Sequence, residues 1–192
     1  MKNTAFFSFF LFITFACYAQ ITTTITWTEK TKLPAANVIY YNSNKKLTWA
    51  DFKGTPDKPD PTAAITSSGF GYNAGMRSKN GKGTINVEIY CYFNKPNSWV
   101  KKGKNTAYIL NHEQHHFDAT YIIAKTFISR VKEAALTPEN MNAELAKIYK
   151  DCNSLLTKLQ DDYDKQTRNG IDKLNQAAWD EIFKEKLVVA NK

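Results

Sequence analysis

The chain has 192 residues, which is enough for one domain with a hydrophobic core. Its formal net charge is +8. The lysines are scattered instead of being interleaved with aromatic residues in one stripe, which argues against a nucleic-acid-binding protein. A basic surface of this size suits weak contact with an anionic envelope surface, although it is also a common kind of solvated surface.

The first 19 residues predict an export signal. Lys2 is followed by an almost wholly apolar run, Ala5 to Ala16, and then by a small-x-small cleavage site, Cys17-Tyr18-Ala19. A run of this length is typical of a secretory signal peptide and is too short to span a membrane. Removing it deletes one Lys and no acid, so the charge of +8 falls to +7 in the predicted mature chain, residues 20–192.

Cys17 offers an alternative, because a lipoprotein is anchored through a cysteine at such a place. The residue three positions upstream is Thr14 and not an aliphatic residue, which favours soluble export. We therefore expect a periplasmic or secreted protein, with anchoring through Cys17 as the less favoured route.

The first half of the mature chain carries strand patterns. Alternating or β-branched residues predict strands over 21–28, 37–41, 64–76 and 84–93. The third of these alternates Ser, Gly and aromatic residues, which indicates close approach of other backbone. Asn80-Gly81 predicts a hairpin turn before the fourth strand, and three prolines in residues 55–62 predict an irregular loop.

The second half carries helix patterns. Apolar residues that recur near i, i+3, i+4 and i+7 predict a first helix from about residue 105 to Leu136. Thr137-Pro138-Glu139 predicts the start of a second helix, with Thr137 as its N-cap, and Gly170 predicts its end. A third helix covers residues 171–186. Strands followed by about three helices predict an α+β domain with a mostly antiparallel sheet.

Within the first predicted helix, residues 112–116 contain all three histidines of the chain and spell H-E-x-x-H. His112 and His116 are one turn apart, so both imidazoles can reach one cation. Glu113 lies beside that cation, where its carboxylate can accept a proton from water. This is the arrangement of zinc metalloproteases. A His-rich surface turn, or core imidazoles satisfied by neighbours, is the alternative.

A catalytic zinc site takes three protein ligands, so the third must come from another residue type, with a carboxylate as the first choice. Asp161, Asp162 and Asp164 lie near the end of the second predicted helix, and Asp164 is favoured; solvated acids are the alternative. Asp118 projects about 120° away from His112, which favours a hydrogen bond to a ligand over ligation. His115 is either a bystander or a donor that faces substrate.

Two cysteines remain in the mature chain, Cys91 in a strand pattern and Cys152 in a helix pattern. In an oxidising compartment they can form a disulfide that closes a loop of about 60 residues. Two free buried thiols are the alternative. Their spacing matches no zinc-binding pattern, so neither is expected to hold metal.

Six short motifs follow one another in the mature chain. They are L-T-W-x-D-F-x-G (47–54), A-A-x-T-S (63–67), S-W-V (98–100), L-x-H-E-Q-x-H-F-D (110–118), Y-D-x-x-T (163–167) and Q-x-x-W (176–179). In this order they resemble the bacterial family called domain of unknown function 922, described as predicted secreted zinc-dependent proteases. The resemblance covers nearly the whole mature chain. It implies a single zincin-like metallopeptidase domain, zinc on His112 and His116, and a catalytic Glu113.

One position departs from that family. The Y-D-x-x-T stretch of the family continues x-His-Gly, whereas this chain has Arg168-Asn169-Gly170. If the family's His is a third ligand, Asn169 would bind zinc poorly. If that His donates a hydrogen bond to a developing oxyanion, the amide of Asn169 can partly replace it.

These patterns predict an exported zinc metallopeptidase that acts on a peptide or protein substrate and binds no nucleic acid. The alternative is an envelope binding or scaffold protein that keeps the fold but has no catalytic turnover, a possibility raised by Asn169. A basic binder of envelope polymers is a third class, and its affinity would collapse with salt. Substrate, cleavage preference and oligomeric state are not predicted.

Overall fold

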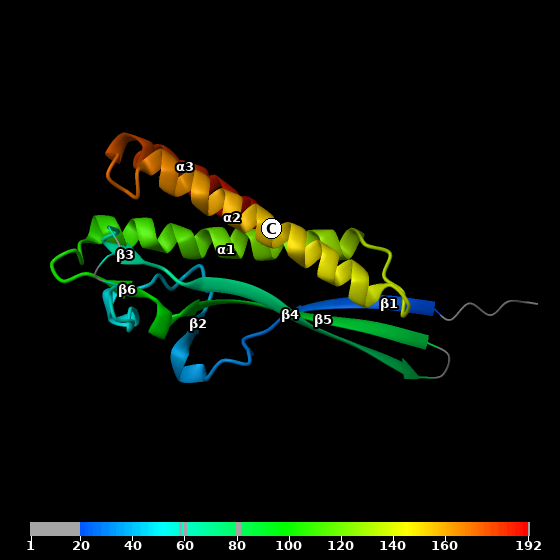
Figure 1. Ribbon diagram of the computed structural model, residues 1–192. Coiled ribbons are helices and arrows are strands. Elements are labelled where there is room, and N and C mark those ends of the chain that lie inside the picture. The colour runs from blue at the N-terminus through cyan, green and yellow to red at the C-terminus, as the bar shows by residue number, and fades with distance from the viewer. Residues whose placement is uncertain (1–19, 58, 60, 80–81, 192) are drawn as a thin grey trace, which may run out of the picture.

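A computed structural model describes residues 20–57, 59, 61–79 and 82–191. The predicted signal peptide, with Cys17, and the predicted turn at residues 80–81 lie outside them. Strands precede helices, which confirms the α+β class (Figure 1). The elements are β1 (Gln20–Trp27), the 3-10 helix η1 (Ala35–Asn37), β2 (Val38–Tyr40), the 3-10 helix η2 (Trp49–Asp51), β3 (Ala64–Ile65), β4 (Ser68–Lys79), β5 (Lys82–Asn94), the 3-10 helix η3 (Lys95–Asn97), β6 (Trp99–Val100), α1 (Ala107–Glu133), α2 (Met141–Thr167) and α3 (Lys173–Ala190).

β5 is the centre of the main sheet. β4 pairs with it antiparallel along one edge, over the whole of β4. β1 and β2 share the other edge: β1 runs parallel to residues 82–89 of β5, and β2 runs antiparallel to residues 92–94. β3 and β6 form a separate antiparallel pair. The main sheet is therefore mostly antiparallel, as predicted.

Apolar residues occupy every second position of β5, and their side chains point into the core. Ile85, Val87, Ile89, Cys91 and Phe93 are all completely buried. Successive side chains of a strand point to opposite faces, so these five share the face that α1 covers. The alternating pattern that predicted this strand therefore also predicted its buried side.

The glycines of β4 accommodate tyrosine rings of β5. Gly71 pairs with Tyr90, and Gly69 pairs with Tyr92. A Cβ atom on Gly71 would lie 2.6 Å from the hydroxyl oxygen of Tyr90, so a larger residue there would displace the tyrosine ring. This is the close approach that the Ser, Gly and aromatic pattern predicted.

The strand predicted over residues 64–76 is divided into β3 and β4. Between them the chain bonds to other elements: the Thr66 hydroxyl donates to the backbone carbonyl of Glu113 (3.1 Å), and the Ser67 N–H donates to Oγ of Ser98 (2.9 Å). These bonds turn β3 away from the main sheet and attach it to α1. β3 is thereby brought to the H-E-x-x-H segment.

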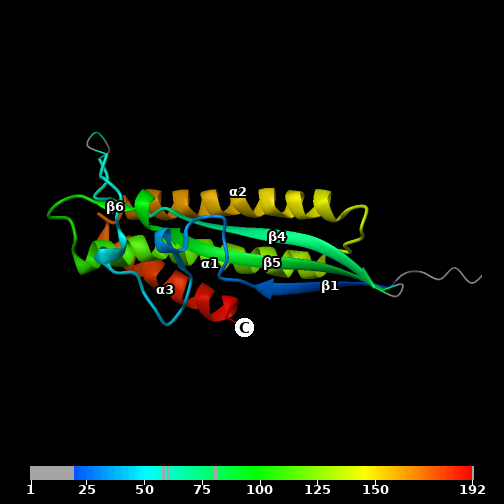
Figure 2. The same ribbon diagram turned by 90° about the horizontal axis from the view of Figure 1, so that it is seen from below.

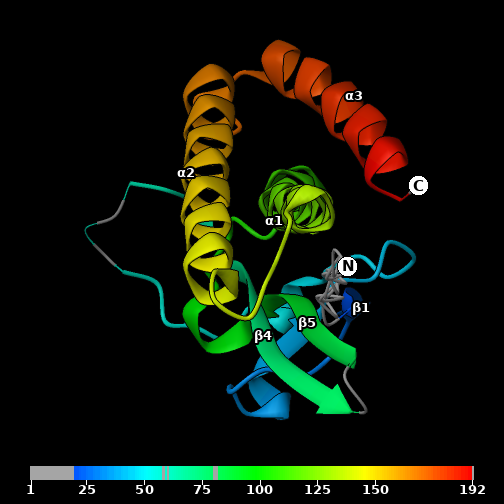
Figure 3. The ribbon, with the colours of Figure 1, turned by 90° about the vertical axis from the view of Figure 1, so that its right-hand side faces the viewer.

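α1 lies between the sheet and the other two helices (Figures 1 and 3). Figure 2 shows α2 and α3 on opposite sides of α1. A helix that is covered on several sides has no fully polar face, and residues 112–120 of α1 are all buried. The H-E-x-x-H segment therefore lies inside the protein. None of the helices in the described ranges is long and apolar enough to cross a membrane.

α2 begins at Met141, so the predicted N-cap at Thr137 is wrong. The Thr137 N–H donates to Oδ1 of Asn140 (2.7 Å), and the Asn140 N–H donates to the Thr137 hydroxyl (3.3 Å). These reciprocal bonds close a turn around Pro138, and the helix starts after it. Its end at Thr167 agrees with the prediction.

The two cysteines of the described chain are free thiols. Cys91 lies in β5 and Cys152 in α2, and both are buried. Burial raises the pKa of the Cys91 thiol well above its usual value. The second of the two alternatives for these cysteines therefore holds.

Candidate metal centre

The H-E-x-x-H segment lies in the first half of α1, at the end of the molecule where β3, the end of α2 and the start of α3 come together (Figure 1). Thr106 caps α1, because its hydroxyl accepts a hydrogen bond from the Ile109 N–H (3.2 Å). A cavity of about 670 Å³ opens at this place. Residues of α1, of β3 and its flanks, of the loop before α1 and of the segment between α2 and α3 line it.

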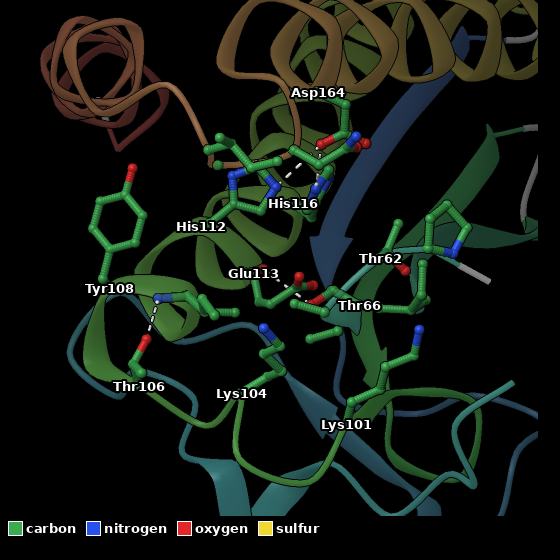
Figure 4. A pocket seen from close by; sticks show the side chains of 18 of the residues that line it. Thr62, Thr66, Lys101, Lys104, Thr106, Tyr108, His112, Glu113, His116 and Asp164 are labelled. Carbon is green, nitrogen blue, oxygen red and sulfur yellow. Dashed lines mark hydrogen bonds and ion pairs between the residues drawn. The ribbon is translucent and has the colours of Figure 1, made fainter. Parts of the chain in front are cut away.

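Three candidate ligands come together on one wall of this cavity (Figure 4). Oδ1 of Asp164 lies 3.1 Å from Nε2 of His112 and 3.1 Å from Nε2 of His116. The three ligand atoms lie within 4.8 Å of one another, and this group can hold a metal ion. Ligands at zinc's usual bond lengths are about 3.3 Å apart in a tetrahedron. The Asp164 oxygen is thus already close to ligand spacing from each imidazole nitrogen.

The charges of these residues favour a cation. Burial alone would raise the pKa of Asp164, but hydrogen bonds from His112 and His116 outweigh it and hold that pKa well below its usual value. Burial alone would lower the pKa of His116, but its bond to Asp164 reverses the direction. Asp164 is therefore an ionised acceptor for the two imidazoles, in the place where a cation would replace their protons.

Glu113 lies beside this group with a carboxyl that is only partly satisfied (Figure 4). The residue is 4% exposed, and Oε2 has no hydrogen-bond partner among the described residues. Burial raises the pKa of the Glu113 carboxyl, although the nearby His116 and His112 oppose the shift. Buried polar atoms without a partner are uncommon. Oε2 of Glu113 could therefore accept a hydrogen bond from a polar group in the cavity, such as a water molecule between Glu113 and a bound metal.

Gln176 of α3 orients the ring of His112. Both amide protons of Gln176 are used, because Nε2 donates to Oδ1 of Asp180 (2.8 Å) and to the hydroxyl of Tyr163 (2.8 Å). Its Oε1 must therefore face Nδ1 of His112, at 2.9 Å, and accept the Nδ1 proton. Nε2 of the same ring faces Asp164 and is the nitrogen that a metal would bind in place of a proton. Asp180 thus acts through Gln176 to orient the His112 ring for metal binding.

Replacing Gln176 with Leu is expected to weaken metal binding about 10–100-fold, the usual cost of losing a partner that orients a ligand. The His112 ring would lose the acceptor that keeps its proton on Nδ1. Chelator competition measures the zinc dissociation constant. Thermal unfolding of the metal-free variant shows whether the fold is kept, and unchanged affinity in a folded variant would contradict this role.

Tyr163 and Gly170 hold the same ring from its sides. The rings of His112 and Tyr163 are stacked, with centroids 4.6 Å apart. Gly170 has a φ of +76°, and a Cβ atom there would lie 3.2 Å from Nδ1 of His112. The glycine that predicted the end of α2 therefore also leaves room for a candidate ligand.

His115 belongs to a different set of contacts and does not line the cavity. Its Nδ1 lies 3.1 Å from Oδ2 of Asp118 and its Nε2 lies 2.9 Å from Oδ1 of Asp180. The ring stacks on Phe183, with centroids 4.5 Å apart. Of the two sequence-based interpretations of His115, the geometry favours a residue that joins α1 to α3 over one that faces substrate.

Asp118 contacts His115 and not the candidate ligands. Its oxygens also accept hydrogen bonds from the Tyr41 hydroxyl (2.8 Å), from Nε2 of Gln114 (2.8 Å) and from Nζ of Lys46 (3.4 Å). Burial would raise the pKa of Asp118, but the bond from His115 and the charge of Lys46 outweigh it, so that pKa is lowered. Asp118 therefore attaches the segment between β2 and β3 to the back of α1.

We expect Asp118→Asn to destabilise the protein by about 3–5 kcal/mol, because it removes the charged member of a buried network. The folded-state pKa of Asp118 is depressed, so its stabilising contribution is present above the ordinary pKa of aspartate and is lost as the pH falls through the lower, folded-state value. Urea unfolding at several pH values tests both points. The difference between wild type and variant should shrink on acidification, and a difference that is constant with pH would contradict this.

The other predicted acids are not part of the metal group. Asp162 pairs with Lys158 (2.6 Å), and Asp161 is exposed. Asn169 follows α2 with a φ of 53° and lines the same cavity as Asp164. Of the three aspartates near the end of α2, the fold brings only Asp164 to the histidines.

No family model matches this chain, and neither does any curated protein or solved structure that was compared with it. The resemblance to domain of unknown function 922 and the zincin-like form of the fold therefore stay predictions. What the site can do has to be argued from its own chemistry.

Proposed function

We propose that this protein is an exported zinc metallopeptidase with a zincin-like fold. One observation carries the proposal: His112, His116 and Asp164 bring three metal-ligating atoms together beside the unpartnered Oε2 of Glu113. Three ligands and a neighbouring buried carboxylate are the parts of a hydrolytic zinc site. The order of residues is that of the H-E-x-x-H metalloproteases, with an aspartate as third ligand.

The ligand set favours zinc over other common cations. Two imidazole nitrogens and one carboxylate oxygen match the mixed donors of catalytic zinc sites. Calcium and magnesium prefer sites made of oxygen atoms. Both histidines are buried and offer Nε2 from one helix face, whereas the described residues supply only one carboxylate to the group.

In the proposed reaction the chain's own residues bind the metal, move the proton and hold the substrate. When bound, zinc acidifies a water molecule and polarises a carbonyl group. Glu113 accepts the proton of the attacking water on Oε2 and delivers it to the amine nitrogen as the peptide C–N bond breaks. Burial helps, because a carboxyl with a raised pKa holds the proton between the two transfers.

An extended peptide can add to an exposed strand edge, and the predicted strands 64–76 and 84–93 are the candidates for such an edge. Residues 84–93 lie in β5, which has β4 on one edge and β1 and β2 on the other, so β3 has the better position. β3 pairs with β6 on one edge and has no strand on the other among the described residues. Its residues and the adjacent Thr66 line the cavity. A peptide added to this edge would pass the candidate metal group.

Elemental analysis and a hydrolysis assay test the proposal together. We expect near-stoichiometric zinc in protein purified without added metal, and cleavage of a peptide library that stops with a chelator and returns with zinc. Zinc without any hydrolysis would favour the envelope scaffold protein. Absence of zinc even after dialysis against it would exclude the metallopeptidase.

A further inference from the structure

The cavity of the candidate metal centre has a wall that carries lysines. Residues 101–106 connect β6 to α1 and pass beneath Glu113. Lys101 and Lys104 both line the cavity, and Figure 4 shows the amino group of Lys104 directed toward Glu113, whereas that of Lys101 is directed toward Thr62. A third lysine, Lys173 at the start of α3, also lines the cavity, and its Nζ lies 5.9 Å from the ring centroid of Tyr108.

The charges of the described residues that line the cavity do not cancel. Among the described residues the only acidic side chains in its lining are Glu113 and Asp164, and both are assigned to the metal and the proton. Within the same residues neither Lys104 nor Lys173 forms an ion pair. A bound divalent cation would make the cavity still more positive. Such a field draws in anionic ligands and repels cationic ones.

A second polar atom in the lining has no partner. The hydroxyl oxygen of Tyr108 is buried and makes no hydrogen bond with the described residues. Tyr108 lies in the first turn of α1, whose N–H groups carry the positive end of the helix dipole. Donors and positive charge therefore occur on both sides of Glu113, in a cavity large enough for several residues of a peptide.

We infer that the substrate presents a carboxylate to Lys104, next to the bond that is cleaved. This rests on the proposed function, because it names the substrate class of the same site. The carboxylate has two sources, an Asp or Glu side chain near the scissile bond or the free C-terminus of a short peptide. A lysine suits either source, because its ammonium is a point charge without the fixed fork of arginine.

The test compares peptides that differ in one residue. Using the zinc-loaded full chain, kcat/KM is measured with Glu, Gln or Lys placed in turn at the two positions on each side of the cleaved bond, with free and with amidated C-termini. We expect one position where Glu exceeds Gln about fivefold, the size expected for one partly exposed ion pair, with Lys poorer than both. If the C-terminus is the source, amidation lowers kcat/KM by the same factor instead.

Substitutions in the loop of residues 101–106 show which lysine causes the preference for a carboxylate. Lys104→Ala should remove the preference, and Lys104→Glu should reverse it in favour of Lys peptides. Lys102→Ala is the matched control, because Lys102 lies in the same loop but does not line the cavity. Raising the salt should reduce the wild-type preference, since the ammonium groups are in contact with solvent.

Measurements of peptide binding test this inference independently of the proposed peptidase activity. The dissociation constants of the same peptides for the Glu113→Gln protein are measured by fluorescence anisotropy. Tighter binding of the carboxylate peptides, lost in Glu113→Gln/Lys104→Ala, supports the inference even if wild type cleaves nothing and the peptidase proposal fails. Equal kcat/KM and equal binding for Glu, Gln and Lys peptides, or an equal loss in Lys102→Ala, would overturn it. No binding of any peptide would overturn it as well.

Discussion

Glu113→Gln should lower kcat by about 10²–10⁴-fold, the usual contribution of a general base, and leave the zinc content unchanged. The amide has the shape of the carboxyl but cannot accept a proton. Glu113 is not one of the three candidate ligands, so its replacement leaves His112, His116 and Asp164 in place. A peptide hydrolysis assay measures kcat, and elemental analysis of the same preparation measures the zinc content.

Stability provides a further readout of the same variant. The Glu113 carboxyl is buried and one of its oxygens has no partner, so its charge destabilises the folded state. We expect the midpoint of thermal unfolding of the metal-free Glu113→Gln protein to be no lower than that of wild type, as is common where a group serves activity and not stability. Glu133→Gln, at the exposed end of α1, is the matched control and should change neither property. Wild-type activity in Glu113→Gln would refute the mechanism.

Asp164→Ala is expected to weaken zinc binding by more than the about 10–100-fold that follows loss of an orienting partner. It removes one of three ligands and also the acceptor that holds both imidazoles 3.1 Å from one oxygen. Competition with a chelator measures the affinity, and the spectrum of the Co²⁺ form reports the change in ligands. Hydrolysis should fall with the loss of metal.

Asp162→Ala provides the control for that change. Asp162 lies in the same turn of α2 but points to Lys158 at the surface. Removing it takes the same charge from the same helix without touching the cavity, so the metal affinity should stay that of wild type. Equal affinity of wild type and Asp164→Ala would mean that Asp164 is not a ligand.

The sequence alone was sufficient for the parts of the site that lie close together in the chain. The spacing of His112 and His116 puts both imidazoles on one helix face, and Thr106 marks where that helix begins. The third candidate ligand was narrowed to three aspartates, of which Asp164 was favoured. Which of them faces the histidines depends on the rotation of α2 against α1, and this comes from packing between distant residues.

The residues that orient the ligands were not assigned a role from the sequence. Gln176 was visible only as part of the Q-x-x-W motif at residues 176–179. Asp180 carried no signal of its own, although its place four residues after Gln176 puts the two on one face of a helix. Their contacts with His112 and His115 span more than 60 residues of chain. Local pattern contains no information about such pairs.

Local sequence determined the kinds of element in this protein, because the period of the apolar residues and the capping groups act over a few residues. It determined the buried face of β5 and the helical register of the histidines. Tertiary structure decided what surrounds the two histidines: Asp164 from α2 and the lysines of the loop before α1 line the cavity, and Gln176 from α3 contacts His112 from behind it. The physical reason is that α1 is covered on several sides, so the partners of its buried polar groups come from whichever elements pack against it.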